Sequence, residues 1–519
     1  MAIIDFFDRG WRINPQGAAY IQDGKATSFA EAGEMSCRIA NGLQAQQLAP
    51  GTKGAVWAGN DVTAWLCALG LWRANLCWIP VGARNAAEEN RYVLDTFDCE
   101  ILFFQQEFAE AIAALRPHLP KIRLWVCIDG EVEGATSLER FIAEQPATAP
   151  QVSVDPDDVI WVGPTGGTTG LPKGVMNTHR SVQTSFAHVM INTPYPANTF
   201  PVNLAAAPMT HTSGLLSMPC TARGGTVVVI TKPDPQLLLA AIPRYQVTEL
   251  FLPPTVIYRL LDIPELNKKV DFSSLRYFLY GAAPMSVEKL RRAIEVFGPV
   301  MMEGYGQTEA PGAIAHLPPG EHFEDGRVAG DERLSSVGRP NPLIRVEIMD
   351  GRNQILPQGE TGEICVRGDM VMKGYYKDPQ KTAETIIDGW LHTGDVGHLD
   401  AHGYLHITDR KKDMIISGGF NVYPSEVEQV LWAHPAVRDC AVIGVPDDKW
   451  GEAVKAVVEL NAGQSVEAEA LLALCKEKLG SVKAPKSVEF VAALPRSPAG
   501  KVLKKDLRAQ YWQGQQRRI

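Results

Sequence analysis

The chain has 519 residues, more than one hydrophobic core usually supports, so we expect two or more domains. Its composition, 45% hydrophobic and 21% charged, is that of an ordinary globular protein, and its net charge of −9 argues against nucleic acid as the main partner. The most apolar stretch, residues 62–72, is too short to span a bilayer, so no membrane insertion is expected.

Nine cysteines are scattered along the chain, and none belongs to a C-x-x-C pair. An odd number without such pairs indicates reduced, buried cysteines rather than a disulfide framework or a zinc site. Residues 1–8 lack the basic and long apolar segments of a signal peptide. We therefore expect a cytoplasmic protein.

The first four hundred residues alternate short apolar runs with helical patterns. Strands are predicted at 54–58, 77–81, 100–104, 226–230, 249–252 and 276–280, and helices at 62–75 and 86–96. Strand–helix alternation of this kind predicts layered α/β structure with mostly parallel sheets.

Past residue 340 the pattern changes to short strands, at 344–349, 362–367 and 403–408, separated by Gly- and Asp-rich turns. These predict a small β-rich subdomain at about 335–411. Helices at 425–433 and 467–479 and strands at 440–445 and 453–460 then predict a small, mobile α+β domain. We place the domains at 1–411 and 412–519.

A Gly- and Thr-rich loop, Thr165 to Gly174, directly follows an apolar stretch. Glycines let backbone N–H groups turn toward an anion, hydroxyls add donors, and Lys173 adds a positive charge. The common phosphate loop, G-x-x-x-x-G-K-[ST], requires Gly before Lys, whereas Pro172 stands here. The loop predicts a protein that handles a nucleoside triphosphate without being a standard P-loop NTPase.

Four further segments carry polar groups in unusual settings: YGAAP at 280–284, EGYGQTE at 303–309, HTGD at 392–395 and PRSPAGK at 495–501. Small residues after a strand leave backbone against which a flat ring can lie. Glu309 beside the hydroxyl of Thr308 suits Mg²⁺. Asp395 is a carboxylate on a tight turn, and Lys501 is a cation on a Pro/Gly turn.

Taken together and in this order, these segments resemble those of the adenylate-forming superfamily, which contains acyl-CoA synthetases, adenylation domains and beetle luciferases. The resemblance covers the whole chain. It implies that a carboxylate attacks the α-phosphorus of MgATP to give acyl-adenylate and pyrophosphate, and that a thiol then displaces AMP. ATP, Mg²⁺, coenzyme A and a small carboxylic acid would be the partners. Charge builds on phosphate oxygens, so positioned donors and cations matter most.

The resemblance also implies roles for individual residues. Lys501, Glu309, Thr169, Lys173 and His211 would be catalytic, and Glu309 and Thr169 would bind the metal. The expected ATP/AMP-binding residues are Thr165, Gly166, Gly167, Thr168, Thr169, Gly170, Lys173, Gly281, Ala282, Ala283, Glu303, Gly304, Tyr305, Gly306, Thr308, Asp395, Arg410 and Lys501. Among these, Tyr305 would stack on adenine, Asp395 would accept from the ribose hydroxyls, and Arg410 would donate to ribose or phosphate.

Lys501 and the phosphate loop lie in different predicted domains, so the resemblance implies domain closure and then rotation about a hinge at Lys412. Rotation would bring in a thiol tunnel formed by Ser417, Gly418 and Gly419. The acyl pocket would be lined by His211, Phe251, Gly281, Gly304, Gly306, Pro311 and Gly312. Because the motifs that line the acyl pocket contain no arginine to pair with a second carboxylate, we expect an apolar fatty, alicyclic or aromatic monocarboxylate.

Several alternatives stay open. The chain is either a CoA ligase, a loader of a carrier protein in trans, a luciferase-like oxidase or a non-catalytic nucleotide sensor. Plain structural roles compete as well: loop capping for Thr168 and Thr169, a core histidine for His211, and a simple turn at Gly418-Gly419. A homodimer and acetylation of Lys501 by a lysine acetyltransferase are further hypotheses.

Overall fold

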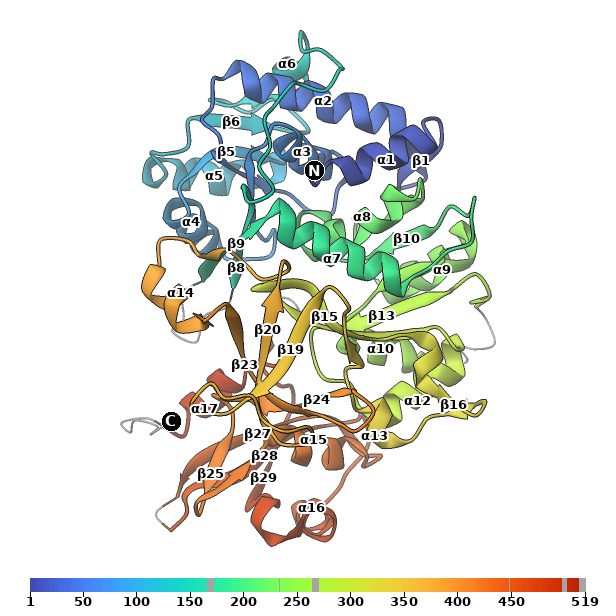
Figure 1. Ribbon diagram of the computed structural model, residues 1–519, viewed down its shortest axis with the longest axis vertical. Helices are drawn as coiled ribbons and strands as arrows, with labels where there is room; N and C mark the ends of the chain where they lie inside the picture. Colours follow the sequence, from blue (N-terminus) through green and yellow to red (C-terminus); the bar gives the residue numbers. More distant parts are fainter. Residues whose placement is uncertain (166–171, 233, 264–269, 448, 497–501, 513–519) are drawn as a thin grey trace.

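The computed structural model describes residues 1–165, 172–232, 234–263, 270–447, 449–496 and 502–512, with only the backbone of 211–212. The molecule contains four main sheets (Figure 1). The eight- and nine-stranded sheets are built mostly from residues before 341, and the two five-stranded sheets are built from later residues. The predicted class is confirmed: a large part of layered α/β sheets with a β-rich subdomain, followed by a small α+β part.

The first sheet has eight strands in the order β21-β9-β8-β4-β3-β5-β6-β7. Its strands are β3 (Lys53–Trp57), β4 (Cys77–Pro80), β5 (Cys99–Phe104), β6 (Leu124–Cys127), β7 (Thr136–Ser137), β8 (Val159–Thr165), β9 (Lys173–Thr178) and β21 (Gly374–Tyr375). From β7 to β8 neighbouring strands run parallel, whereas β9 and β21 are antiparallel additions at one edge.

The second sheet has nine strands in the order β18-β15-β14-β13-β12-β10-β11-β1-β2. They are β1 (Ala18–Gln22), β2 (Lys25–Ser28), β10 (Val202–Ala205), β11 (Thr226–Val229), β12 (Glu249–Phe251), β13 (Tyr277–Gly281), β14 (Met301–Gln307), β15 (Ala310–Leu317) and β18 (Arg339–Pro340). The six strands from β14 to β1 are parallel, so their carboxyl ends share one edge, where ligands of such sheets usually bind.

Helices cover both sheets (Figure 1). They are α1 (Asp5–Ile13), α2 (Phe29–Ala45), α3 (Val62–Arg73), α4 (Ala87–Thr96), α5 (Ala109–Leu115), α6 (Leu138–Ile142), α7 (His179–Asn192), α8 (Gly214–Ala222), α9 (Pro235–Tyr245), α10 (Pro254–Leu261), α12 (Val287–Phe297) and α13 (Asp331–Leu334). Shorter turns are η1 (Gln106–Phe108), η2 (Arg116–His118), η3 (Met209–Ser213) and η4 (Pro319–His322).

Helix α3 shows how the sequence fixes the core. Asp61 starts it, because its carboxylate accepts from the N–H of Ala64 at 2.9 Å. The helix is mainly apolar and eleven of its twelve residues are buried, as expected for a helix packed between layers. Trp65 and Trp72 meet edge to face at 5.4 Å. All nine cysteines are buried and free, as the sequence predicts.

The third sheet contains β19 (Ile344–Met349), β20 (Gly362–Gly368), β22 (Ile386–Ile387), β23 (Trp390–Leu399) and β24 (Leu405–Arg410), all antiparallel. A small hairpin, β16 (Phe323–Glu324) and β17 (Arg327–Val328), precedes it, and α14 (Pro379–Thr385) lies within its span. This sheet is the β-rich subdomain that the sequence predicts.

The fourth sheet is built only from residues after 411. Its strands are β25 (Ile415–Ser417), β26 (Phe420–Val422), β27 (Val437–Asp447), β28 (Gly451–Leu460) and β29 (Ser487–Val491), with α15 (Pro424–Trp432), α16 (Ala468–Lys483) and α17 (Lys504–Ala509). The boundary at 411/412 stays a prediction. Within the described part of the chain, no helix is both long and apolar enough to cross a membrane.

Candidate active site

The predicted phosphate loop joins the two strands of a hairpin. Thr165 ends β8 and is the register partner of Lys173, which begins β9. Gly166, Gly167, Thr168, Thr169 and Gly170 lie between them, outside the described residues. The hairpin therefore fixes both ends of the loop, and it places Lys173 at the edge where β21 joins the sheet.

Lys173 lies beside a tyrosine that holds the predicted metal-binding carboxylate. The Lys173 Nζ is 5.4 Å from the ring centre of Tyr375, and the Tyr375 hydroxyl donates to Oε1 of Glu309 at 2.9 Å. Burial raises the pKa of Tyr375, and the nearby Glu309 carboxylate raises it further, so the phenol keeps its proton and remains a donor. The structure thus brings Lys173 and Glu309 together through a residue that the sequence analysis missed.

Backbone contacts hold this corner in place. The N–H of Met372 donates to the carbonyl oxygen of Glu309 at 2.8 Å, and Nδ2 of Asn177 donates to that of Thr308 at 3.1 Å. The only local signal for Tyr375 is its position in the pair Gly374-Tyr375, which is too common to indicate a site. Its role depends on β21 pairing with β9, some two hundred residues away along the chain.

Glu309 is a single carboxylate, and such a site suits Mg²⁺ bound together with substrate phosphates better than a metal ion held by protein ligands alone. Among the described residues, no group of three or more His, Cys, Asp or Glu side chains is placed to hold a metal ion. Mg²⁺ commonly takes one or two carboxylates and completes its shell with water and substrate phosphates. A single carboxylate near a lysine and a phosphate loop matches that habit, while the second predicted ligand, Thr169, lies outside the described residues.

Asp395 is fixed by two partners. The Tyr305 hydroxyl donates to Oδ2 at 2.7 Å, and Nε of Arg410 lies 3.2 Å from Oδ1. Arg410 is also the register partner of Asp395 across β23 and β24. An ionised carboxylate has about four acceptor positions, so two remain for hydroxyl donors such as those of a ribose. The structure therefore brings these three predicted residues into one cluster.

Tyr305 itself is 9% exposed and packs in the same apolar cluster as Ile314 and Ala315. Its hydroxyl orients Asp395, a role that the sequence analysis did not foresee. Stacking of its ring on adenine stays a prediction.

The small residues at the carboxyl ends of β13 and β14 are needed for close backbone packing. Gly281 and Gly304 are register partners, and a methyl group on Gly281 would lie 2.3 Å from the carbonyl oxygen of Gly304. A methyl group on Gly306 would lie 2.1 Å from the carbonyl oxygen of Gly312. Ala282, which follows β13, has φ +66, an uncommon left-handed conformation for a residue with a side chain.

The other predicted pocket residues gather at the same end of the sheet or close by. Phe251 is half-buried at the end of β12, while Pro311 is buried and Gly312 exposed in β15. Ala283 follows Ala282 directly. His211 lies in the π-helical turn η3, a turn type that often marks functional sites, and its side chain is outside the described atoms.

Glu303 has a partner, Tyr280, that is separate from those of Asp395. Its carboxyl group is buried against Tyr280, and burial raises its pKa to about 8. The Tyr280 hydroxyl in turn bonds to Nε2 of His322 at 3.0 Å. The contact of Glu303 with ATP stays a prediction. In this structure the Glu303 side chain is buried and packs against Tyr280.

The predicted thiol tunnel lies far from the hairpin β8–β9. Gly418 and Gly419 form the two-residue turn between β25 and β26, with φ +60 and +83. Figure 1 places β25 at the lower end of the molecule, whereas β8 and β9 lie above its middle. Along the chain, Lys412 lies between β24 and β25, and Lys501 is outside the described residues. In this arrangement Ser417, Gly418 and Gly419 do not meet the phosphate hairpin β8–β9.

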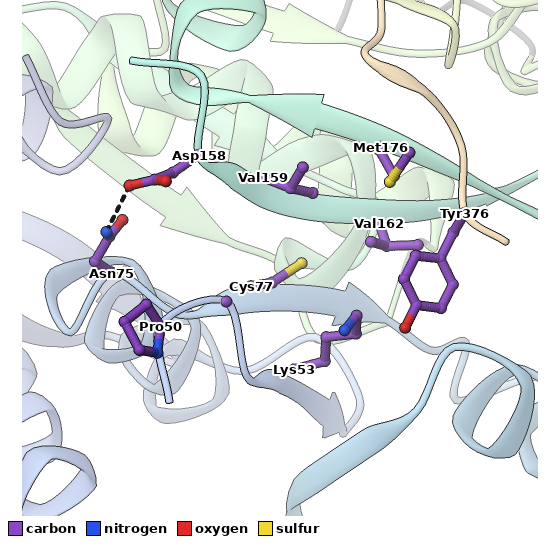
Figure 2. Close-up of a pocket in the computed structure, with 10 residues that line it drawn as sticks. Pro50, Lys53, Asn75, Cys77, Asp158, Val159, Val162, Met176 and Tyr376 are labelled. Atoms are coloured by element: carbon purple, nitrogen blue, oxygen red, sulfur yellow. Dashed lines mark hydrogen bonds between the residues drawn. The ribbon is translucent and has the colours of Figure 1, made fainter. Parts of the chain in front are cut away.

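A separate pocket of about 280 Å³ lies against the first sheet (Figure 2). Val159 and Val162 of β8, Met176 of β9, and Cys77 of β4 line it, and Asn75 bonds to Asp158 at its rim. None of the predicted site residues lines this pocket.

Two families match this chain. Residues 7–376 match the family described as AMP-binding enzyme, and residues 426–501 match the AMP-binding enzyme C-terminal domain.

Curated relatives span much of the chain. A feruloyl-CoA synthase from Amycolatopsis sp is 36% identical over 96% of this chain and 97% of its own length. The medium/long-chain-fatty-acid–CoA ligase FadD8 of Mycobacterium tuberculosis is 41% identical over 72% of this chain, and the match spans 65% of FadD8. ScoC of Streptomyces coeruleorubidus, a fatty acid–[acyl-carrier-protein] ligase, is 32% identical over 97% of this chain and 95% of its own length.

A solved structure has the same fold. The amide bond synthetase McbA from Marinactinospora thermotolerans aligns with a TM-score of 0.88 and 32% identity, over 98% of this chain and all of its own.

Proposed function

Because the chain belongs to the AMP-binding enzyme family of the adenylate-forming superfamily, and is an acid–thiol ligase of the AMP-forming type, we propose that it makes an acyl-CoA from a carboxylic acid, ATP and coenzyme A. The observation that carries the proposal is one short segment, Tyr305 to Glu309. Its first residue holds Asp395 and its last is held by Tyr375 beside Lys173. These five residues, four steps along the chain, span at most about 14 Å, a length that suits a ribose site at one end and a phosphate site at the other.

In the first step one carboxylate oxygen of the acid attacks the α-phosphorus of ATP. The bond from the α-phosphorus to the bridging oxygen breaks, and pyrophosphate leaves with the electron pair. Asp395 and Arg410 orient the ribose, while Lys173 stabilises the charge that develops on the leaving pyrophosphate. Lys501 would bring the two anionic reactants together, although it lies outside the described residues.

Mg²⁺, when bound, neutralises phosphate charge. Glu309 would hold it through the carboxylate oxygen not used by Tyr375, and Thr169 would be the second protein ligand. Tyr375 keeps the carboxylate turned toward the phosphate hairpin.

In the second step the thiol loses its proton to solvent and its sulfur attacks the acyl carbon. The bond from the acyl carbon to the bridging oxygen breaks, and AMP leaves with the electron pair and one oxygen of the original acid. The hairpin β25–β26 suits this step after rotation about Lys412. Its turn is formed by two glycines, and it is flanked by exposed aromatic rings, Phe420 at 59% and Trp450 at 41% exposure. These apolar surfaces would lose water if the hairpin packed against the large domain.

We propose an apolar monocarboxylate as the acid. The pocket candidates at the strand ends are mostly small residues, and none of them is an arginine that would neutralise a second carboxylate. Two of the relatives act, by their names, on fatty acids and on ferulic acid. Both acids have a single carboxylate on an apolar body.

A carrier protein is the alternative acceptor. ScoC, which is named for transfer to an acyl carrier protein, matches nearly the whole chain. The exposed rings beside Gly418-Gly419 serve a protein-borne thiol arm equally well, so the acceptor has to be measured.

The test is a pyrophosphate-release assay with matched acids, each with and without coenzyme A. Octanoate against suberate compares one and two carboxylates on the same chain, and cinnamate against ferulate compares ring substitution. Asp395→Asn provides the background rate. We expect release with a monocarboxylate, faster with coenzyme A, and acyl-CoA by mass spectrometry. Release that ignores coenzyme A would favour a carrier protein, and no acid exceeding the background would contradict the proposal.

A further inference from the structure

A carboxylate of the large domain binds the start of a helix in the small one. Asp409, near the end of β24, accepts from the backbone N–H of Ser425 at 2.9 Å and from that of Arg410 at 2.7 Å. Ser425 lies in the first turn of α15, whose N-cap Tyr423 supplies no side-chain cap. A negative charge at that position stabilises the helix through its unpaired N–H groups and its dipole. The hydroxyl of Ser425 also donates to the carbonyl oxygen of Thr408.

Lys504 of α17 completes a buried charge cluster at the same place. Its Nζ lies 2.8 Å from Oε1 of Glu428 in α15, and the Glu428 side chain is only 4% exposed. The same oxygen accepts from the N–H of Val442 at 2.7 Å. Burial alone would lower the pKa of Lys504, but the attraction of Glu428 and Asp409 raises it, so the ammonium stays charged.

Helix α17 is tied down at its other end as well. Nη1 of Arg508 lies 2.7 Å from Oδ1 of Asp413, with both side chains largely buried. The helix begins three residues after Lys501, so its position limits where the segment carrying Lys501 can reach.

We propose that Lys504 is a positioning residue for the adenylation step, and that with Asp409 it forms a latch that holds the small domain in the arrangement of this structure. The inference rests on the proposed function, because it assigns the latch to the first of the two half-reactions. Lys504 would act through the placement of Lys501 rather than on the reacting atoms.

The position of the predicted hinge explains why the contacts of Asp409, and not the other pairs of the cluster, depend on the arrangement of the domains. Asp409 precedes Lys412, whereas Asp413, Glu428, Lys504 and Arg508 all follow it. A rotation about residue 412 leaves the pairs Lys504–Glu428 and Arg508–Asp413 intact, but it separates Asp409 from the N–H of Ser425 and from Lys504. Opening the latch therefore ends the contacts of Asp409 with the small domain, while the ion pairs inside the small domain persist.

The variants separate positioning from folding. Asp409→Asn removes the charge but keeps an oxygen that can accept from Ser425, and it leaves the Lys504–Glu428 pair in place. Lys504→Met leaves Glu428 buried without its partner, so it risks unfolding the small domain. Lys504→Arg keeps a positive charge at this position and tests whether that charge restores the rate lost in Lys504→Met. Lys505→Met is the matched control, because Lys505 is the next residue of the same helix, is exposed and has no ion pair to another described residue.

Two half-reactions are measured for each variant: pyrophosphate release from ATP and acid, and consumption of preformed acyl-adenylate by coenzyme A. We expect Asp409→Asn and Lys504→Met to slow the first about tenfold or more and to leave the second unchanged or faster. Lys504→Arg should recover most of the loss, and Lys505→Met should behave as wild type. Equal loss in both half-reactions, or none in either, would overturn the inference.

A distance measurement tests the latch without activity. All nine native cysteines are buried, so spin labels can be placed selectively at Ala383→Cys in α14 and Ala473→Cys in α16, two exposed positions on either side of the hinge. The wild type should give one dominant distance, and Asp409→Asn a second or broader population. An unchanged distribution in Asp409→Asn would overturn the latch even in an active enzyme. An inactive wild type with the predicted shift would instead leave the latch standing and refute the proposed function.

Discussion

Tyr375 links the two predicted charges of the phosphate site, since its hydroxyl holds Glu309 while its ring lies beside Lys173. At the scale of single residues, most of the candidate chemistry depends on such orienting contacts. Tyr305 does the same for Asp395. Glu309, Lys173 and Asp395 could be predicted from the sequence, because each is a charged residue in a short segment of unusual composition, rich in Gly and Thr. The tyrosines that orient them could not be assigned that role, since their partners lie 66 and 90 residues away along the chain.

Tyr375→Phe should weaken adenylation and raise the Mg²⁺ requirement. It removes the donor to Glu309 but keeps the ring, and a hydrogen bond to a charged group contributes about 1.5–3 kcal/mol, so we expect roughly a tenfold or greater fall in pyrophosphate release at low Mg²⁺. Tyr376→Phe is the control, because its hydroxyl donates to Asp98 at 2.6 Å instead. The measurement is the rate as a function of Mg²⁺ concentration. The same Mg²⁺ dependence in both variants would contradict the orienting role.

Glu303 should make the protein less stable at alkaline pH. Burial raises its pKa from 4.5 to about 8, so the folded state keeps a proton that the unfolded state releases. The contribution of this proton to the free energy of unfolding is fully present below pH 4.5. It then falls by about 1.4 kcal/mol per pH unit up to about pH 8. Glu303→Gln stays neutral and lacks this loss. Thermal unfolding at pH 6 and pH 9 should therefore show a larger drop in Tm for wild type than for Glu303→Gln, and parallel drops would contradict it.

At the scale of elements, several strands and helices could be predicted from apolar runs, including the three-residue strand β12, whereas others, such as the long helix α2, were not predicted. The strand predicted at 344–349 is β19, and the helix predicted at 62–75 is α3, which ends two residues earlier at Arg73. The strands β25 and β26 are three residues each, and only the glycines of their turn were noticed. The order of strands in the large sheets, which brings β21 beside β9, depends on long-range pairing that no local pattern carries.

The turn between β25 and β26 gives the sharpest test at this scale. Gly419 has φ +83 and no atom near its open side, so Gly419→Asn keeps the turn, because Asn tolerates this conformation, while adding a side chain. We expect the thiol step from preformed acyl-adenylate to slow about tenfold or more and pyrophosphate release to persist. Gly463→Asn is the matched control, with φ +75 and equally open space in the same domain. Equal effects of the two variants would count against a tunnel at Gly419.

At the scale of the whole molecule, the hairpin β25–β26 lies far from the hairpin β8–β9 in Figure 1. The ion pairs of α17 hold that helix to Glu428 of α15 and to Asp413. In this arrangement the predicted tunnel does not reach the phosphate hairpin. Domain rotation about Lys412, a homodimer and acetylation of Lys501 remain predictions.

Lys501→Ala tests the division of labour between the domains. Loss of this cation should slow adenylation by orders of magnitude, since two anions must then approach without it, and should spare thioester formation from preformed acyl-adenylate. The two half-reactions are followed separately. Wild-type rates of acid activation in this variant would refute both its catalytic role and its regulation by acetylation.

The most direct test of the two-step chemistry follows one oxygen atom. The enzyme is given ATP, coenzyme A and an active monocarboxylate labelled with oxygen-18 in both carboxyl oxygens, and AMP, phosphate and pyrophosphate are analysed by mass spectrometry. Attack of the carboxylate on the α-phosphorus predicts one labelled oxygen in AMP and none in the other two products. Label in phosphate, or none in AMP while acyl-CoA accumulates, would contradict the account.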